Sequence, residues 1–176
     1  DVTRCPPKRL AIDNLTVRFG GLVALDGVSF AVEPGQVVGL IGPNGAGKST
    51  VFNLICRIYD PLEGDIRFGG ESLLGARPHE VINHGIARTF QNIELFDHSS
   101  VLQNLLIGRH CRRNTRWFEE LLFLPKVRRS EREHRLLVEE VIDFLDLAPY
   151  RDKLIAGLPY GVRKVVEIAR ALASEP

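Results

Sequence analysis

The chain has 176 residues, with 23 Lys and Arg against 22 Asp and Glu, which gives a formal net charge of +1. A nearly neutral chain has no global field that would favour nucleic acid or an anionic membrane surface. No stretch approaches the roughly 18 consecutive apolar residues of a membrane-spanning helix, so we expect no direct membrane insertion.

The cysteines and the ends of the chain indicate no catalytic or disulfide chemistry. Cys5, Cys56 and Cys111 are widely spaced and form no C-x-x-C pair, so we expect reduced thiols without a structural role. The chain contains no Met and ends at Pro176, directly after a strongly helical pattern. We therefore expect the sequence to be a fragment of a longer protein.

Apolar and polar residues alternate through the first 35 residues, as in strands with one buried face. The alternation runs over residues 10–12, continues in a shifted phase over 15–19, and returns over 28–32. Gly20-Gly21 and Pro34-Gly35 are turn signals between these segments. The pattern predicts an antiparallel β flap.

A glycine-rich loop follows the short apolar run Val37–Ile41, which is typical of a strand buried on both faces. Residues 42–50 fit G-x-x-x-x-G-K-[ST], the P-loop motif, and a helix is predicted to begin at Lys48. Glycines let backbone N–H groups approach phosphate oxygens, and the helix dipole attracts the same anion. The Lys48 ammonium can reach the β- and γ-phosphates, and the Ser49 hydroxyl can ligate Mg²⁺. The candidate phosphate-binding residues are Gly42, Pro43, Asn44, Gly45, Ala46, Gly47, Lys48, Ser49 and Thr50.

Three short elements are predicted after this loop. Asp65–Phe68 is interpreted as a strand, Pro78–His84 as a helix with Pro in its first turn, and Ile86–Phe90 as a core strand. His79 and His84 resemble part of a zinc-protease motif, but a spacing of five residues puts the two rings on different helix faces. We therefore expect no metal site at these histidines.

The patterns become helical in the second half of the chain. Ser100 and Gln103 fit a capping box that opens a helix over residues 101–107. Apolar residues then recur at helical spacing within 131–147 and 161–173. Three helices are therefore predicted in this part.

These patterns divide the chain into an α/β nucleotide-binding part with N-terminal antiparallel strands, residues 1–92, and a helical part, residues 93–176. Basic clusters lie at Arg109–Arg113, continuing to Arg116 and Trp117, and at Lys126–Arg135. Such clusters can contact nucleic acid or lipid headgroups but usually form solvated helix faces. Since the net charge is close to zero, we expect no nucleic-acid partner.

Two further segments resemble a known family. Gly85–Gln91 has the sequence GIARTFQ, and Leu158–Leu172 has the sequence LPYGVRKVVEIARAL. With the preceding strands and the P-loop, they resemble the ATP-binding cassette (ABC) ATPases over Leu10–Pro176, and among these the ATPase subunits of branched-chain amino acid importers. The resemblance implies an α/β fold, a P-loop NTPase of ABC type with an antiparallel β flap and a helical subdomain, truncated before the Walker B strand.

The resemblance also assigns roles to Phe19 and Gln91. Phe19 sits where the family has an aromatic side chain that stacks on adenine; the alternative is a core aromatic at a strand end. Gln91 matches the Q-loop glutamine, whose amide can bond Mg²⁺-linked water and report the γ-phosphate to the helical part; the alternative is a surface glutamine. Lys48 and Gln91 are thus the candidate catalytic residues, and Ser49 and Gln91 the candidate metal ligands.

Leu158–Val162 matches the signature loop of the family, usually Leu-Ser-Gly-Gly-Gln, which contacts the ATP held by the other subunit. Pro159, Tyr160 and Val162 depart from that pattern, whereas Gly161 remains at the start of a helix and is the candidate nucleotide contact. Pro159 has neither a hydroxyl nor an N–H to donate, so we expect a weaker contact than Ser would give.

The resemblance implies a function for the intact protein: an ATP-binding subunit of an ABC transporter that couples ATP binding and hydrolysis to solute uptake, with branched-chain amino acids as the expected solute. ATP and Mg²⁺ would be the cofactors. A second ATPase subunit and membrane permease subunits would be the partners, at the cytoplasmic face of the inner (plasma) membrane. The Walker B strand with its catalytic Glu would follow Pro176, so we expect the fragment to bind nucleotide without hydrolysing it.

Two alternatives from other classes stay open. One is a soluble ABC-type ATPase in DNA repair or translation, although such proteins tend to carry long coiled-coil insertions or tandem cassettes. The other is a non-catalytic nucleotide-binding regulatory module. The residues that follow in the parent chain would discriminate, because an apolar run that ends in Asp-Glu indicates an ATPase.

Overall fold

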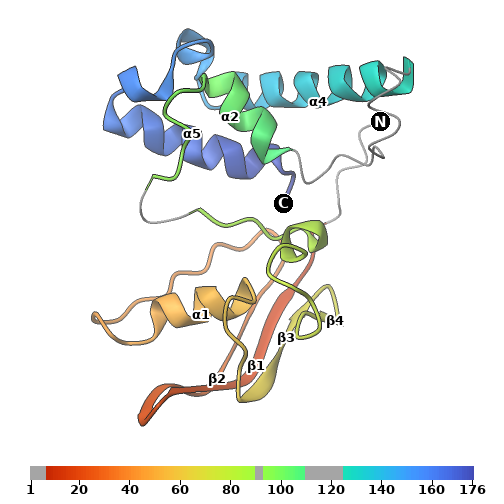
Figure 1. The fold of residues 1–176 in the computed structure, drawn as a ribbon. Helices are drawn as coiled ribbons and strands as arrows, with labels where there is room; N and C mark the ends of the chain where they lie inside the picture. The colour runs from red at the N-terminus through yellow and green to blue at the C-terminus, as the bar shows by residue number, and fades with distance from the viewer. Residues whose placement is uncertain (1–6, 90–92, 110–124) are drawn as a thin grey trace. The chain divides into compact units, whose positions relative to one another are not determined.

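The computed structural model describes residues 7–89, 93–109 and 125–176. The chain divides into two compact units, Asp1–Ile86 and Ala87–Pro176. In the parts that the structure describes, no helix is long and apolar enough to cross a bilayer. The elements are β1 (Leu10–Phe19), β2 (Leu22–Val32), α1 (Lys48–Ile55), β3 (Glu63–Phe68), β4 (Glu71–Ser72), η1 (Val81–His84), α2 (Val101–Gly108), α4 (Pro125–Phe144), η3 (Ala148–Tyr150), η4 (Ile155–Gly157) and α5 (Tyr160–Ala173) (Figure 1).

The described strands of the first unit form a sheet in the order β2–β1–β3–β4, and every neighbouring pair is antiparallel. The Gly20-Gly21 turn joins β1 to β2 and brings Phe19 opposite Leu22. Figure 1 shows α1 alongside this small sheet. The predicted antiparallel flap is confirmed, and so is the strand around Asp65–Phe68.

The shifted alternation in the first strand corresponds to a bulge in β1. The register with β2 shifts between Ile12 and Leu15, and the register with β3 shifts in the same stretch. Asn14 lies in this stretch with a left-handed φ of 51°, and its N–H donates to Ser29 Oγ at 2.7 Å. The irregularity allows Ile12 and Leu15 to lie in the same core, although they are three residues apart.

Helix α1 packs onto the sheet through Val51, Leu54 and Ile55, which are buried. The buried core of the first unit consists of Ile12, Leu15, Val17, Leu25, Val51, Leu54, Ile55, Ile66 and Leu73. Because Val51 and Leu54 are only a few residues from the glycine-rich loop, the same contacts hold that loop close to the sheet.

Two of the predicted strands are absent. Val37–Ile41 pairs with no described strand, and Val37 and Ile41 are both 100 % exposed. Residues 86–89 also form no strand, and Phe90 lies outside the described residues. The buried-strand interpretation was wrong for these segments because a strand buried on both faces needs neighbours that pair its backbone groups. No described strand provides that pairing.

The helix predicted over Pro78–His84 is shorter than expected and of another type. Residues 78–80 form a turn, and a 3₁₀ helix covers Val81–His84. The Glu80 carboxylate accepts a hydrogen bond from the Arg77 N–H at 2.8 Å, and Gly85 ends the helix with a φ of 102°.

The second unit is helical, with α2, α4 and α5 packed around one core. The helix predicted over 101–107 is present as α2, and its capping box is confirmed in both directions: Gln103 N–H donates to Ser100 Oγ, and Ser100 N–H donates to the Gln103 side chain. The helices predicted within 131–147 and 161–173 are present as α4 and α5. The buried core consists of Val101, Leu102, Leu105, Val138, Ile142, Leu147, Ile155, Leu158, Val166, Ala169 and Ala173.

Arg109 is buried and binds within the second unit, so the solvated helix face expected for the basic cluster is wrong for this member, and an exposed phosphate contact is excluded for it as well. Its guanidinium donates to His134 Nδ1 at 2.9 Å, to the Ala173 carbonyl at 3.0 Å and to the Glu175 carboxylate at 3.0 Å. It therefore links the end of α2 to α4 and to the end of α5. The rest of that cluster, through Arg116 and Trp117, lies outside the described residues.

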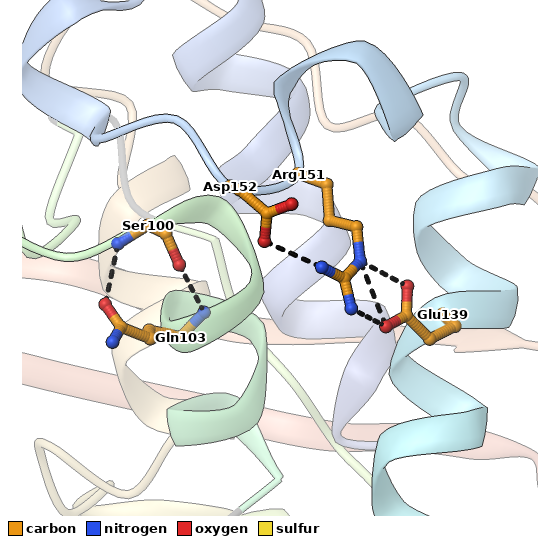
Figure 2. A network of polar contacts seen from close by, with 5 residues as sticks. All are labelled: Ser100, Gln103, Glu139, Arg151 and Asp152. Atoms are coloured by element: carbon orange, nitrogen blue, oxygen red, sulfur yellow. Dashed lines mark hydrogen bonds and ion pairs between the residues drawn. The ribbon is translucent and has the colours of Figure 1, made fainter.

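A second arginine, Arg151, links α4 to the segment that precedes η4 (Figure 2). Its Nε donates to the two Glu139 carboxylate oxygens at 3.0 and 2.8 Å, and its Nη1 donates to Asp152 at 2.7 Å. The Arg151 carbonyl accepts from Leu102 N–H at 3.0 Å, which ties this segment to the first turn of α2. The hydrogen bonds from Arg151 hold the pKa of Glu139 below its ordinary value.

The Glu139–Arg151 pair predicts a pH dependence of stability. Because the pKa of Glu139 is lower in the folded state, its contribution is complete above its ordinary value of 4.5 and is lost as the pH falls through the lowered value. Glu139→Gln should lower the free energy of unfolding near neutral pH and flatten its decline in acid. Urea denaturation followed by circular dichroism across this range measures both effects. Glu140→Gln, at an exposed neighbouring position, is the control. The prediction is contradicted if the free energy of unfolding declines equally in acid for the two variants.

The exposed apolar residues of Val37–Ile41 predict self-association of residues 1–176. Fully exposed Val and Ile side chains next to unpaired backbone favour contacts between copies. Sedimentation velocity should show association that increases with concentration and decreases when Val37 and Ile41 are both replaced by Lys. Leu136→Lys, at an exposed position on α4, should leave it unchanged. A monodisperse monomer at all concentrations would contradict this expectation.

Candidate functional site

The loop over residues 42–47 has the local geometry that an anion-binding loop requires. Gly45 and Gly47 have φ values of 86° and 81°, in the left-handed region that favours glycine. A hydrogen bond of 3.2 Å from Ala46 N–H to the Pro43 carbonyl closes the turn. As predicted, α1 begins at Lys48, and no side chain caps its N-terminus. The first-turn N–H groups and the positive end of the helix dipole are therefore directed toward the loop.

Gly47 also brings the loop into direct contact with the sheet. A Cβ atom at this position would lie 2.6 Å from the Ala24 carbonyl oxygen and 2.8 Å from Leu25 Cδ2, both in β2. Gly45 differs, because a Cβ atom there would meet nothing within 4 Å. The motif predicts a tight glycine turn here, but it gives no sign that Gly47 packs on Ala24.

Lys48 places its ammonium group against the loop that precedes it. Nζ donates to the Gly42 carbonyl and to the Pro43 carbonyl, each at 2.6 Å. An ammonium group has three donors, and these two carbonyls accept from two of them. The positive charge is thus held where the loop N–H groups and the helix N-terminus meet, and the loop residues 42–46 around it are exposed.

The remaining loop residues fit a Mg·nucleotide. Ser49 is exposed in the first turn of α1, one residue beyond Lys48, and Thr50 is partly buried. Mg²⁺ retains most of its waters and takes one or two protein oxygens, so a single accessible hydroxyl beside a phosphate site suits it. Across the described ranges, no group of three or more His, Cys, Asp and Glu could hold a metal ion by itself.

Phe19 lies at the end of β1, just before the turn into β2. Its side chain is 44 % exposed and is not part of the buried core. Its ring contacts the Tyr59 ring edge to face, with centroids 5.1 Å apart and an interplanar angle of 72°. Sequence reasoning missed Tyr59, because nothing in its local pattern indicates the ring that it meets.

The other expected site residues belong to the second unit or cannot be placed. Gly161 is exposed in the first turn of α5, whose N-cap residue Pro159 provides no side-chain hydrogen bond. The Arg163 guanidinium donates to the Leu158 carbonyl at 3.1 Å and to the Ala156 carbonyl at 2.8 Å, which fixes the loop before the helix. Gln91 lies outside the described residues.

Comparison with known proteins identifies the family. Residues 25–176 match the family model described as ABC transporter, so the chain belongs to the ABC transporter family. It is 41 % identical over 167 residues to the high-affinity branched-chain amino acid transport ATP-binding protein BraF of Pseudomonas aeruginosa. It is 35 % identical to the corresponding LivG protein of Escherichia coli. Both matches include 95 % of this chain, and the chain spans 66 % of the length of each relative.

A solved structure agrees with this assignment. The ADP conformation of MJ1267, described as an ATP-binding cassette of an ABC transporter, has a TM-score of 0.80 and 36 % identity to this chain. The match covers 96 % of this chain and 66 % of that one. The predicted ABC-type α/β fold is thereby confirmed, as is the resemblance to the ATP-binding proteins of branched-chain amino acid transport.

The contact between Gly47 and Ala24 predicts that two glycines of the loop respond differently to Ala. Gly45→Ala should cost about 1–2 kcal/mol, because it only places a Cβ in the left-handed region. Gly47→Ala should cost about 1–3 kcal/mol more, because its Cβ also overlaps the Ala24 carbonyl oxygen and Leu25 Cδ2. Urea denaturation measures both costs, and equal losses of stability would show that the contact with β2 is unimportant.

Proposed function

We propose that this chain is the nucleotide-binding part of an importer ATPase that couples ATP binding and hydrolysis to the uptake of branched-chain amino acids. The observation that carries the proposal is the arrangement at the start of α1, where Lys48, the glycine turns and an uncapped helix N-terminus converge. The relatives support the choice of solute, since BraF and LivG are named for branched-chain amino acid transport.

Each part of a Mg·ATP molecule has a candidate partner in the first unit. The N–H groups of residues 42–50 and the Lys48 ammonium would hold the phosphates, and the Ser49 hydroxyl would hold Mg²⁺. The exposed Phe19 ring would stack on the base. Stacking recognises a flat ring and not its hydrogen-bonding edge, so it would select weakly between bases. When bound, Mg²⁺ supplies charge neutralisation on the phosphate oxygens.

Catalysis by these residues would consist of positioning and electrostatic stabilisation. Lys48 is preorganised on the Gly42 and Pro43 carbonyls, so its charge is in place before a nucleotide arrives. Gln91 would bond the metal-linked water and transmit the state of the γ-phosphate to the helices that follow it in the chain. The 176 residues by themselves would bind nucleotide without turnover, because the family's activating Glu belongs to a strand that they do not include.

A second ATPase subunit would complete the site with its own signature loop. ATP-driven closure of the two ATPase subunits would be transmitted to membrane permease subunits at the cytoplasmic face of the membrane. In this chain the signature contact would come from the backbone near Gly161 and from the N-terminus of α5. Pro159 lacks both a hydroxyl and an N–H, so this contact would be weaker than one made by Ser. Copurification of the intact protein with a permease would distinguish transport from a soluble or regulatory role.

Lys48→Ala provides the direct test of nucleotide binding. Loss of a charge-assisted hydrogen bond costs about 1.5–3 kcal/mol, so the affinity for Mg·ATP should fall roughly tenfold to a hundredfold. Isothermal titration calorimetry measures this change. Lys153→Ala is the matched control, since Lys153 lies over the Tyr150 ring in the other unit, with 5.0 Å from its ammonium to the ring centroid. An unchanged affinity of Lys48→Ala would contradict the proposal.

The expected lack of turnover has a separate test on residues 1–176. Phosphate release from Mg·ATP should be negligible, because the general base that activates the attacking water is missing from these residues. ATP turnover by the wild-type sequence that disappears in Lys48→Ala would overturn this part of the proposal. The proposed nucleotide binding would still stand.

A further inference from the structure

The aromatic pair beside the glycine-rich loop suggests a role for Tyr59. The two rings are in contact, yet Phe19 remains 44 % exposed and Tyr59 remains 40 % exposed. Phe19 comes from the end of β1, and Tyr59 comes from the segment that follows α1. The pair therefore joins the hairpin to the helix that begins at the phosphate-binding loop.

The edge-to-face geometry means that Tyr59 does not enclose the Phe19 ring. In such a pair the edge of one ring meets the face of the other, so Tyr59 covers at most one of the two Phe19 faces. At least one Phe19 face is therefore not covered by Tyr59. A half-exposed ring held in one orientation is better prepared for stacking than one that rotates freely, because less side-chain entropy is lost on binding.

The backbone around Tyr59 is held at the end of α1. Arg57 N–H donates to the Leu54 carbonyl at 2.9 Å, and Ile58 N–H donates to the Asn53 carbonyl at 2.8 Å. Three residues beyond Tyr59, Leu62 N–H donates to the Thr16 carbonyl of β1 at 2.9 Å. The segment that carries Tyr59 is thus attached to the P-loop helix on one side and to the strand of Phe19 on the other.

The Arg57 side chain adds a further constraint on this turn. Its side chain is only 6 % exposed, and its Nη2 lies 2.5 Å from Asp60 Oδ1 and 2.7 Å from the Leu74 carbonyl. Because Tyr59 lies between Arg57 and Asp60 in the chain, this contact closes the turn around it. The turn is thereby fixed independently of the ring contact itself.

The aromatic pair also lies within reach of the phosphate site. Gly47 packs on Ala24, and Ala24 is two residues along β2 from Leu22, which is about 7 Å in a strand. Leu22 is the partner of Phe19 across the hairpin. A molecule with phosphates at Lys48 and a flat base at Phe19 would therefore span neighbouring parts of one unit.

We propose that Tyr59 is a positioning residue for the nucleobase: its ring orients Phe19 so that one Phe19 face stacks on the base of a nucleotide whose phosphates lie in the loop at Lys48. The inference rests on the proposed nucleotide-binding function and deepens it. It assigns base affinity to a pair of rings and phosphate affinity to the loop.

The two contributions can be separated by comparing Mg·ATP with inorganic tripolyphosphate, which has the phosphates without the base. Tyr59→Ala should weaken Mg·ATP binding roughly two- to tenfold, the range expected for losing an aromatic pair, and leave tripolyphosphate binding unchanged. Tyr59→Phe keeps the ring and should restore wild-type affinity. Phe144→Ala, which removes an exposed ring from α4, is the control.

A double-mutant cycle tests whether Tyr59 acts through Phe19. In the Phe19→Ala background, Tyr59→Ala should cause no further loss of Mg·ATP affinity. Independent losses from the two variants, equal losses for Mg·ATP and tripolyphosphate, or no loss at all would each overturn the inference. A failure of the proposed function is a different result, in which neither probe binds or Lys48→Ala binds both as well as the wild type does.

Discussion

The close approach of the Gly47 backbone to the Ala24 carbonyl is the contact on which the position of the glycine-rich loop depends. It holds the first residue before α1 against β2, while Val51 and Leu54 bury the next turns of the helix in the same core. The orientation of the uncapped helix N-terminus, and with it the position of the Lys48 ammonium, follows from these two attachments. A side chain as small as a methyl group at position 47 would separate the loop from the sheet, because Val23 and Leu25, on either side of Ala24, are held by their pairing with β1.

Much of the fold could be predicted because its signals are local. Ser100 and Gln103 define the start of α2 from four residues of sequence, and the glycines of the loop define the start of α1. Val37–Ile41 could not be interpreted correctly from its apolar character, because a strand exists only when another strand pairs with it. For the same reason the sequence shows only a shifted alternation near Asn14, while the bulge itself depends on the registers with β2 and β3.

The candidate site divides in the same way. The loop motif predicts the roles of Lys48 and Ser49, because spacing along the chain and the geometry of one turn are sufficient. The Tyr59 ring has no such signal, since its importance arises from a contact with Phe19, which lies forty residues earlier by their numbers in the chain. Arg109 was misjudged from sequence for a different reason. It belongs to a basic cluster, yet it is buried and its guanidinium links three helices. Charge read from sequence therefore gives no information on whether a side chain faces solvent or core.

The unpaired segment Val37–Ile41 also determines how the first unit would respond to a protease. Exposed backbone outside helices and strands is where proteases cut most readily, so the first cleavage in this unit would fall between β2 and α1. The cut would separate the hairpin covalently from the glycine-rich loop. The two pieces would still remain associated, because β1 from one piece pairs with β3 from the other and Gly47 packs on Ala24 across the cut. The sheet, and not the connecting chain, is what keeps the hairpin beside the loop.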